Sequence, residues 1–186
     1  MKNVICVLGF ILTICFFENS AQAQFSLSPT VGLQAPTGQF GARSNTGFGF
    51  ALTGRYMLSE NFATGFMVGL NTFKGTVRIY EPFPIPHYSN YPTRSVVFPM
   101  AGIFEYHYPM GFITPFAGSD MGLYLSTYKF SSTKSSNFFF GFSPKVGAIY
   151  PFTDAISFTA DMKVNIYFNN GGRAWIGVNA GICYNL

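Results

Sequence analysis

The sequence predicts an all-β fold: an eight-stranded antiparallel up-and-down β-barrel that crosses a membrane, preceded by an export signal. Two observations lead to it. Apolar residues alternate with small or polar ones in about eight segments, and the composition is poor in charge and rich in aromatic residues. The apolar face of the last segment consists of Ile176, Val178, Ala180, Ile182, Tyr184 and Leu186. Strands of soluble sandwiches can also alternate, so the prediction depends on repetition of the pattern behind an export signal.

The composition favours a protein whose surface meets lipid. Charged residues make up 10% of the 186 residues and aromatic residues 19%, whereas soluble domains carry about 25% charged residues. After the leader, no stretch approaches the roughly 18 apolar residues of a spanning helix. A chain of this kind crosses a bilayer only as a closed barrel, because lipid cannot satisfy an open sheet edge. The length allows one domain.

The net charge and the number of cysteines limit the classes of partner and of site that the chain can have. The net charge of +4 is dispersed, and the absence of any run of Lys or Arg argues against nucleic acid. Cys6 and Cys15 lie in the leader, which leaves Cys183 alone in the mature chain. A single cysteine allows no intrachain disulfide and no thiolate metal site. We expect neither a metal nor a cofactor.

Residues 1–23 have the features of a secretory signal peptide. Lys2 provides the positive start, Val4 to Phe17 the apolar core, and Ala21-Gln22-Ala23 a small-x-small cleavage site. Cleavage there leaves residues 24–186 as the barrel domain. A retained helical anchor is the alternative, but its core of about 14 residues is shorter than the ~20 that a spanning helix needs.

The first three strands are expected at residues 25–35, 47–58 and 62–73. Each alternates large apolar side chains with Gly, Ser, Thr or Ala, the pattern of a strand with one greasy face. Pro36-Thr37-Gly38 opens a polar loop over residues 36–46, and Ser59-Glu60-Asn61 forms a tight turn.

Residues 74–94 are predicted to form a long loop. The segment contains Pro82, Pro84, Pro86 and Pro92. Proline cannot donate to a hydrogen-bond ladder, so this density excludes a central strand. The segment has room for a short extended hairpin near residues 76–80.

Five further strands are expected at residues 95–108, 114–130, 138–150, 156–168 and 175–186. Turns at Pro109-Met110-Gly111 and Thr153-Asp154, a polar loop over 131–137 and a Gly-rich loop over 169–173 connect them. Pro99 and Pro144 fall inside predicted strands. Proline has no backbone N–H, and every strand of a closed barrel is hydrogen-bonded on both sides. Each of these prolines therefore predicts a β-bulge or a shifted strand boundary.

Over residues 25–186 the chain resembles the small eight-stranded outer-membrane barrels of the OmpA/OmpX type. The leader, the Pro36-Thr37-Gly38 loop start, Gly47-Phe48-Gly49-Phe50 and the strand-turn from Tyr56 to Asn61 carry the resemblance. It implies a location in the cell outer membrane, both termini in the periplasm, short turns on that side and long loops outside.

The C-terminus is similar to the signal that the barrel-insertion machinery reads in this family. The alternating residues concerned are Ile182, Tyr184 and Leu186. The family usually ends in Phe, and this chain departs from it by ending in Leu.

The implied topology places most loop charge outside the cell. The basic residues concerned are Arg43, Lys74, Arg78, Arg94, Lys134 and Arg173. They are accompanied by one acid, Glu81, whereas the opposite turns carry Glu60 and Asp154. Because Arg and Lys bind phosphate well, the hypothesis is that these residues contact lipopolysaccharide; ordinary solvated loop charge is the alternative. The Tyr, Phe and Pro content of residues 74–94 also suits adhesion to an unidentified surface partner.

Six charged residues fall on the inward face of the strands. They are Arg55, Glu105, Asp120, Lys145, Asp161 and Lys163, three of each sign. An eight-stranded barrel is only wide enough for side chains to fill it, and buried charges need partners. We expect a paired polar plug, with a narrow ion path as the alternative.

An enzyme is not expected. His107 falls beside Glu105 at the periplasmic end and His87 lies between prolines, so no Ser-His-carboxylate set shares one rim. The integral outer-membrane barrel with a structural or surface-interaction role is therefore the first hypothesis. The second is a secreted lipocalin-like carrier of a small apolar ligand, which would turn its large apolar residues inward.

Overall fold

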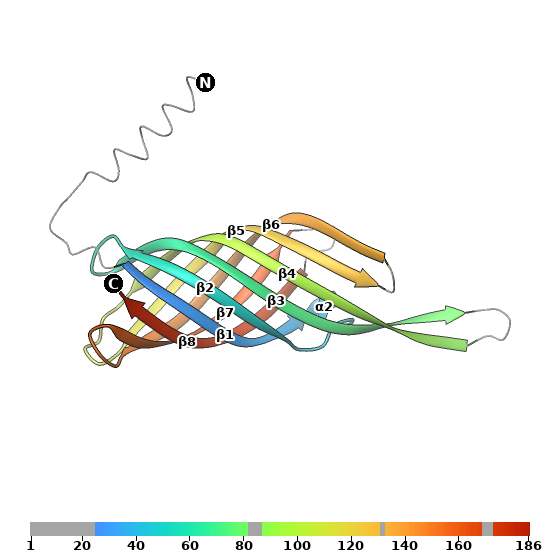
Figure 1. Cartoon of the computed structure of the whole chain (residues 1–186), viewed down its shortest axis with the longest axis horizontal. Helices are drawn as coiled ribbons and strands as arrows, with labels where there is room; N and C mark the ends of the chain where they lie inside the picture. The colour runs from blue at the N-terminus through green and yellow to red at the C-terminus, as the bar shows by residue number, and fades with distance from the viewer. Residues whose placement is uncertain (1–24, 82–86, 131–132, 169–172) are drawn as a thin grey trace, which may run out of the picture.

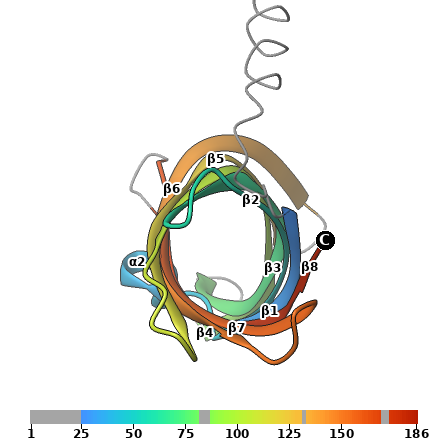
Figure 2. The same cartoon turned by 90° about the vertical axis from the view of Figure 1, so that its left-hand side faces the viewer.

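The computed structural model describes residues 25–81, 87–130, 133–168 and 173–186. Its elements in chain order are β1 (Phe25–Thr37), α2 (Gly38–Gly41), β2 (Gly47–Met57), β3 (Phe62–Glu81), β4 (His87–His107), β5 (Thr114–Phe130), β6 (Thr133–Pro151), β7 (Ile156–Tyr167) and β8 (Arg173–Asn185). Each strand pairs antiparallel with the next, and β8 pairs with β1, which closes the barrel (Figures 1 and 2). The predicted eight-stranded up-and-down barrel is confirmed. The predicted signal peptide lies outside the described residues.

The two ends of the barrel differ. At the turn end, β1 begins, β8 ends, and short turns join β2 to β3, β4 to β5 and β6 to β7 (Figure 1). At the hairpin end, β3 and β4 continue as a two-stranded ribbon well beyond the barrel wall, and the β5–β6 hairpin extends less far (Figure 1). No described helix is long and apolar enough to cross a bilayer.

The prediction of a long loop over residues 74–94 is wrong for residues 74–81 and 87–94. Lys74 to Glu81 continue β3 and pair in register with His87 to Arg94 of β4. Pro92 is compatible with this ribbon because it lies one residue beyond the last β4–β5 pair, where that edge needs no amide donor. The other three prolines fall in residues 82–86, outside the described part of the chain.

Three other loop boundaries also need correction. The polar loop at 131–137 is mostly strand, because β6 begins at Thr133 and pairs with β5 as far as Phe130. The loop at 36–46 begins later, since β1 runs to Thr37 and α2 follows. Arg173, expected in the last loop, is the first residue of β8 and pairs with Tyr167. In each case, residues expected in a loop still pair with a neighbouring strand: residues 133–137 with β5, Pro36 and Thr37 with β8, and Arg173 with β7.

Neither a β-bulge nor a shifted strand boundary occurs at Pro99 or Pro144, so this prediction is also wrong. Pro99 pairs with Tyr124 of β5 and Pro144 with Ser119 of β5 without an extra residue. On the other side of each proline the ladder is interrupted, and it resumes in the same register. A missing N–H is therefore accommodated by a local gap in pairing on one side of the strand.

The apolar faces of the strands point outward. Phe48, Val31 and Phe104 are more than 60% exposed, as are other large apolar side chains around the barrel. Inward positions are held by polar, charged and a few aromatic side chains, and by a small aliphatic cluster of Met67, Ala101 and Ile103. This distribution is opposite to that of a soluble carrier, whose apolar residues would line the interior.

Candidate functional site

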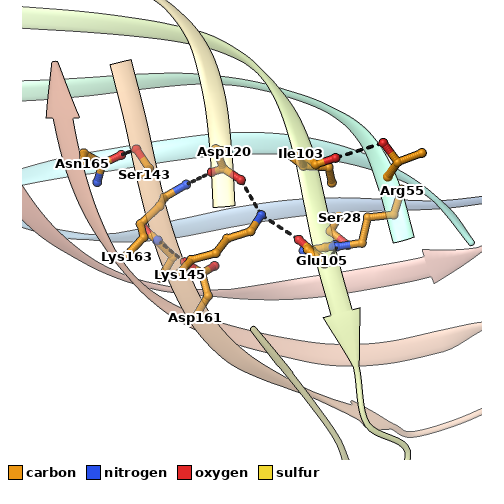
Figure 3. Close-up of polar contacts among 12 residues, drawn as sticks. Ser28, Arg55, Ile103, Glu105, Asp120, Ser143, Lys145, Asp161, Lys163 and Asn165 are labelled. Carbon is orange, nitrogen blue, oxygen red and sulfur yellow. Dashed lines mark hydrogen bonds and ion pairs between the residues drawn. The ribbon is translucent and has the colours of Figure 1, made fainter. Parts of the chain in front are cut away.

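A chain of ion pairs crosses the interior of the barrel in its turn-end half (Figure 3). Arg55 of β2 donates through Nε to Glu105 Oε2 of β4 at 2.8 Å. Lys145 Nζ of β6 lies 2.6 Å from Glu105 Oε1 and 2.5 Å from Asp120 Oδ1 of β5. Lys163 Nζ of β7 completes the chain at 3.4 Å from Asp120 Oδ2.

These charges are buried, and each has a partner. Arg55, Glu105, Asp120 and Lys145 are all less than 10% exposed. Arg55 Nη1 also donates to Ser28 Oγ at 2.7 Å. Space for the carboxylate comes from Gly118, which faces Glu105 across the β4–β5 pair and whose added Cβ would meet Glu105 Cγ at 3.0 Å. Because an unpaired buried charge is strongly unfavourable, the five charges are held together as one unit.

Asp161, the sixth inward charge, belongs to a different chain of contacts. Its Oδ1 accepts a hydrogen bond from Asn179 Nδ2 at 2.8 Å. Asn179 Oδ1 accepts from Gln34 Nε2 at 2.8 Å, and Gln34 Oε1 accepts from Trp175 Nε1 at 2.9 Å. These hydrogen bonds connect Asp161 to Trp175, which belongs to the aromatic layer described next.

An aromatic layer fills the interior toward the hairpin end. Trp175 lies between the rings of Phe73, Tyr124 and Tyr167, with centroid distances of 5.7, 6.1 and 5.9 Å. All four side chains are fully buried. Phe40 of α2 packs edge-on against Phe73 at 5.0 Å. The sequence pattern alone does not predict this layer, although Trp175 and Tyr124 occupy inward positions of their strands.

Polar contacts hold the aromatic layer in place. Tyr124 and Ser143 form a hydroxyl–hydroxyl bond of 2.5 Å, and Ser143 Oγ donates to Asn165 Oδ1 at 3.1 Å. Tyr167 lies 3.3 Å from Ser126 through their hydroxyls. The buried rings therefore have polar partners for their hydroxyl groups, as aromatic side chains with polar atoms require.

A pocket of about 230 Å³ opens at the turn end. Arg55 and His107 are among its lining residues, together with Cys183 and the exposed Glu60. His107 Nε2 lies 2.9 Å from Glu105 Oε2, and the ring stacks on Phe116. The pocket therefore has the ion-pair chain beneath it.

The interior residues that could bind a metal ion or carry out chemistry are few within the described ranges. In the described part of the chain, no three His, Cys, Asp or Glu side chains lie close enough together to hold a metal ion. His107 contacts a carboxylate but no serine in the bonds described. The Cys183 thiol is buried and contacts Asn185 Oδ1 at 3.8 Å.

The predicted basic residues are distributed over three places at the hairpin end. Lys74, Arg94 and Lys134 are exposed on the outer face of the strands, not on loops. Arg78 lies further along the β3–β4 ribbon, with its guanidinium 4.6 Å from the centre of the Tyr88 ring. Arg43 is exposed after α2.

Arg173 lies apart from the exposed basic residues. Its guanidinium lies 5.4 Å from the Phe40 ring centre and 5.9 Å from that of Tyr128. This half-buried side chain covers the aromatic layer instead of extending into solvent.

The C-terminal residues Ile182, Tyr184 and Leu186 lie on the outer face. All three are exposed, and the backbone N–H of Leu186 donates to Phe25 O at 2.8 Å. The end of the chain is thus fastened to the beginning of β1 by the barrel closure.

Solved structures of outer-membrane barrels resemble this fold. Neisserial surface protein A aligns with a TM-score of 0.62 at 14% identity, covering 87% of this chain and 96% of that one. OprG from Pseudomonas aeruginosa gives 0.58 at 12% identity, with 88% and 96% covered. The N-terminal barrel domain of P. aeruginosa OprF gives 0.50 at 14% identity, with 89% and 98% covered. At these identities the likeness shows the fold alone.

Family comparison is more specific. No curated protein matches the sequence. The family model described as outer membrane protein beta-barrel domain matches residues 7–182, which include all eight strands apart from the last residues of β8. The chain therefore belongs to the outer membrane protein beta-barrel domain family.

Proposed function

We propose that this protein is a sealed integral barrel of the outer membrane with a structural and surface-interaction role, not an open pore. The observation that carries the proposal is the filled cross-section. A solute entering at the turn end meets the ion-pair chain from Arg55 to Lys163 and then the aromatic layer around Trp175. Small barrels of this size have interiors that side chains fill.

The proposed orientation places the hairpin end outside the cell. Short turns on the periplasmic side and longer outer connections are the general arrangement in such barrels. In this orientation the exposed basic residues at the hairpin end lie near the phosphate-rich lipopolysaccharide of the outer leaflet. Residues 1–23 are then a cleaved signal peptide, and Ile182, Tyr184 and Leu186 are the residues offered to the insertion machinery.

Conductance of the purified protein tests the sealed interior. The protein is inserted in planar bilayers, with heat-modifiable gel mobility as the check that it is folded. We expect no steady conductance above that of protein-free bilayers. A stable open level that persists in samples of uniformly folded protein would contradict the proposal.

A surface-contact role for the β3–β4 ribbon is the second part of the proposal. Tyr80 and Tyr88 pair across the ribbon with ring centres 5.2 Å apart, both are exposed, and Arg78 lies over Tyr88. Exposed aromatic and Arg side chains are enriched at recognition surfaces.

The test replaces residues 76–92 with an Asn-Gly turn and measures attachment of cells to surfaces at equal outer-membrane levels of the protein. The matched control is Arg43→Gln at the same end. We expect the shortened ribbon to reduce attachment and the control to leave it unchanged; unchanged attachment with the shortened ribbon would exclude the ribbon as the contact surface.

A further inference from the structure

Four basic side chains stand side by side on four neighbouring strands. Lys74 of β3 is the register partner of Arg94 of β4, Arg94 of Lys129 of β5, and Lys129 of Lys134 of β6. All four are exposed and share the outward parity of their strands. With strands about 4.8 Å apart, the row spans roughly 14 Å around the barrel. We call this set the cation row.

The cation row lies at the boundary between apolar and polar outer surface. Two residues nearer the turn end, the same four strands carry Thr72, Val96, Thr127 and Ser136 in one register. Thr127 and Ser136 are joined by a hydroxyl–hydroxyl bond of 2.9 Å. Another two residues toward the turn end, the outward positions of these strands are Leu70, Phe98, Leu125 and Phe138. This sequence of apolar, hydroxyl and cationic levels is what a strand passing from hydrocarbon into head groups requires.

Nothing on the protein neutralises the row within the described residues. None of its members takes part in an ion pair there. Glu105, Asp120 and Asp161 lie in the interior, and Glu60 and Asp154 lie at the turn end. Glu81 is at the hairpin end, but it is the last residue of β3, seven positions beyond Lys74. Like charges directly opposite each other destabilise a pair of strands. Three successive like-charge pairs therefore indicate a surface that meets external anions.

The row is confined to one side of the barrel. The outward positions of β7, β8, β1 and β2 carry no Lys or Arg, because Lys163, Arg173 and Arg55 of these strands point inward. A general attraction to an anionic membrane would be served by charges on all sides. The one-sided row favours a localised site.

We propose that Lys74, Arg94, Lys129 and Lys134 form one binding site for the phosphate groups of an outer-leaflet glycolipid, with Thr127 and Ser136 facing its sugar hydroxyls. The site rests on the proposed orientation, with the hairpin end outside the cell. A bisphosphorylated disaccharide head group is elongated and carries phosphates at both ends, which suits a linear row better than a compact cluster.

Binding of defined lipids to the folded barrel in detergent micelles, measured by native mass spectrometry, tests the site. The probes are a bisphosphorylated lipid A, its dephosphorylated form and phosphatidylglycerol. The row variant is Lys129→Gln with Lys134→Gln, and the matched control is Arg43→Gln with Arg78→Gln, which removes the same charge from the same end. Heat-modifiable mobility confirms that each variant is folded.

We expect the row variant to bind bisphosphorylated lipid A about thirtyfold more weakly, since each Lys near an anionic surface contributes roughly 1 kcal/mol. The control should lose no more than about threefold. An equal loss in the control, or an equal loss of phosphatidylglycerol binding by the row variant, would overturn the site. If the wild-type protein fails to distinguish phosphorylated from dephosphorylated lipid A, the proposed lipopolysaccharide contact itself is wrong; if it does distinguish them and the row variant keeps full affinity, only the assignment to the row is wrong.

Discussion

At the scale of single residues, Glu105 lies at a branch of the ion-pair chain. Its two oxygens contact Arg55, Lys145 and His107. The parity of β4 places Glu105 on the inward face, and this much could be predicted from the sequence. Its partners could not, because which inward residues meet across a barrel depends on register and strand tilt. For the same reason the alignment of Lys129 with the three other cations of the row was not evident from the sequence.

Removal of the Glu105 charge should be costly. Glu105→Ala leaves Arg55 and Lys145 without their shared carboxylate in a buried site, and we expect a loss of about 3–5 kcal/mol in the free energy of unfolding. Urea titration of the protein in lipid vesicles measures it.

The control for this change is Glu60→Ala on an exposed turn, with an expected change within about 0.5 kcal/mol. Equal effects of the two substitutions would mean that the interior chain contributes no more than a surface charge.

Trp175 combines packing with a polar contact, and two substitutions separate them. Trp175→Ala removes the contacts with Phe73, Tyr124 and Tyr167, and we expect a loss of about 3–5 kcal/mol. Trp175→Phe keeps an aromatic ring but leaves Gln34 Oε1 without its donor, for a loss of about 1–3 kcal/mol. The same urea titration compares them; a Phe variant as unstable as the Ala variant would assign the whole effect to the hydrogen bond.

At the scale of elements, alternation with period two is sufficient to predict all eight strands, because one face of each is mostly apolar within the barrel wall. It fails where the strands extend beyond the apolar part of the barrel wall. Residues 74–81 and 87–94 pair as a ribbon although proline and polar residues indicated a loop. The proline rule assumes a strand paired on both sides, and Pro92 lies where β4 has lost its β5 neighbour.

The small residues of the strands also have separate roles. Gly118 of β5 lies against the backbone of Phe104 and the side chain of Glu105, so an added Cβ would collide with the neighbouring strand. Gly102 of β4 has its nearest neighbour, Met121 O, at 3.9 Å from an added Cβ, which is ordinary contact.

We therefore expect Gly118→Ala to impair barrel closure and Gly102→Ala to be neutral or slightly stabilising, by up to about 1 kcal/mol. The fraction of refolded protein with heat-modifiable mobility, followed by urea titration, measures both. If Gly118→Ala closes and resists urea like the wild type, the close approach of β4 and β5 at this point is wrong.

At the scale of the whole molecule, the barrel reverses the usual distribution of side chains. Large apolar residues cover the outside, and polar and charged residues fill much of the inside, with the aromatic layer and a small aliphatic cluster of Met67, Ala101 and Ile103 as exceptions. The low charge content of the sequence follows from this arrangement, because the outer wall between the ends carries no charge. The sealed interior, the basic hairpin end and the proposed glycolipid site all depend on which way these faces point.

Nuclear Overhauser contacts between lipid acyl chains and protein methyl groups, recorded in lipid nanodiscs, test this arrangement most directly. Val31, Val146 and Val178 are exposed on the outer face, whereas Val97 and Ile103 are fully buried inside. The account predicts acyl-chain contacts for the methyl groups of the three outer valines. It predicts none for the methyl groups of Val97 and Ile103. Acyl-chain contacts at Val97 or Ile103, or their absence at the three outer valines, would contradict it.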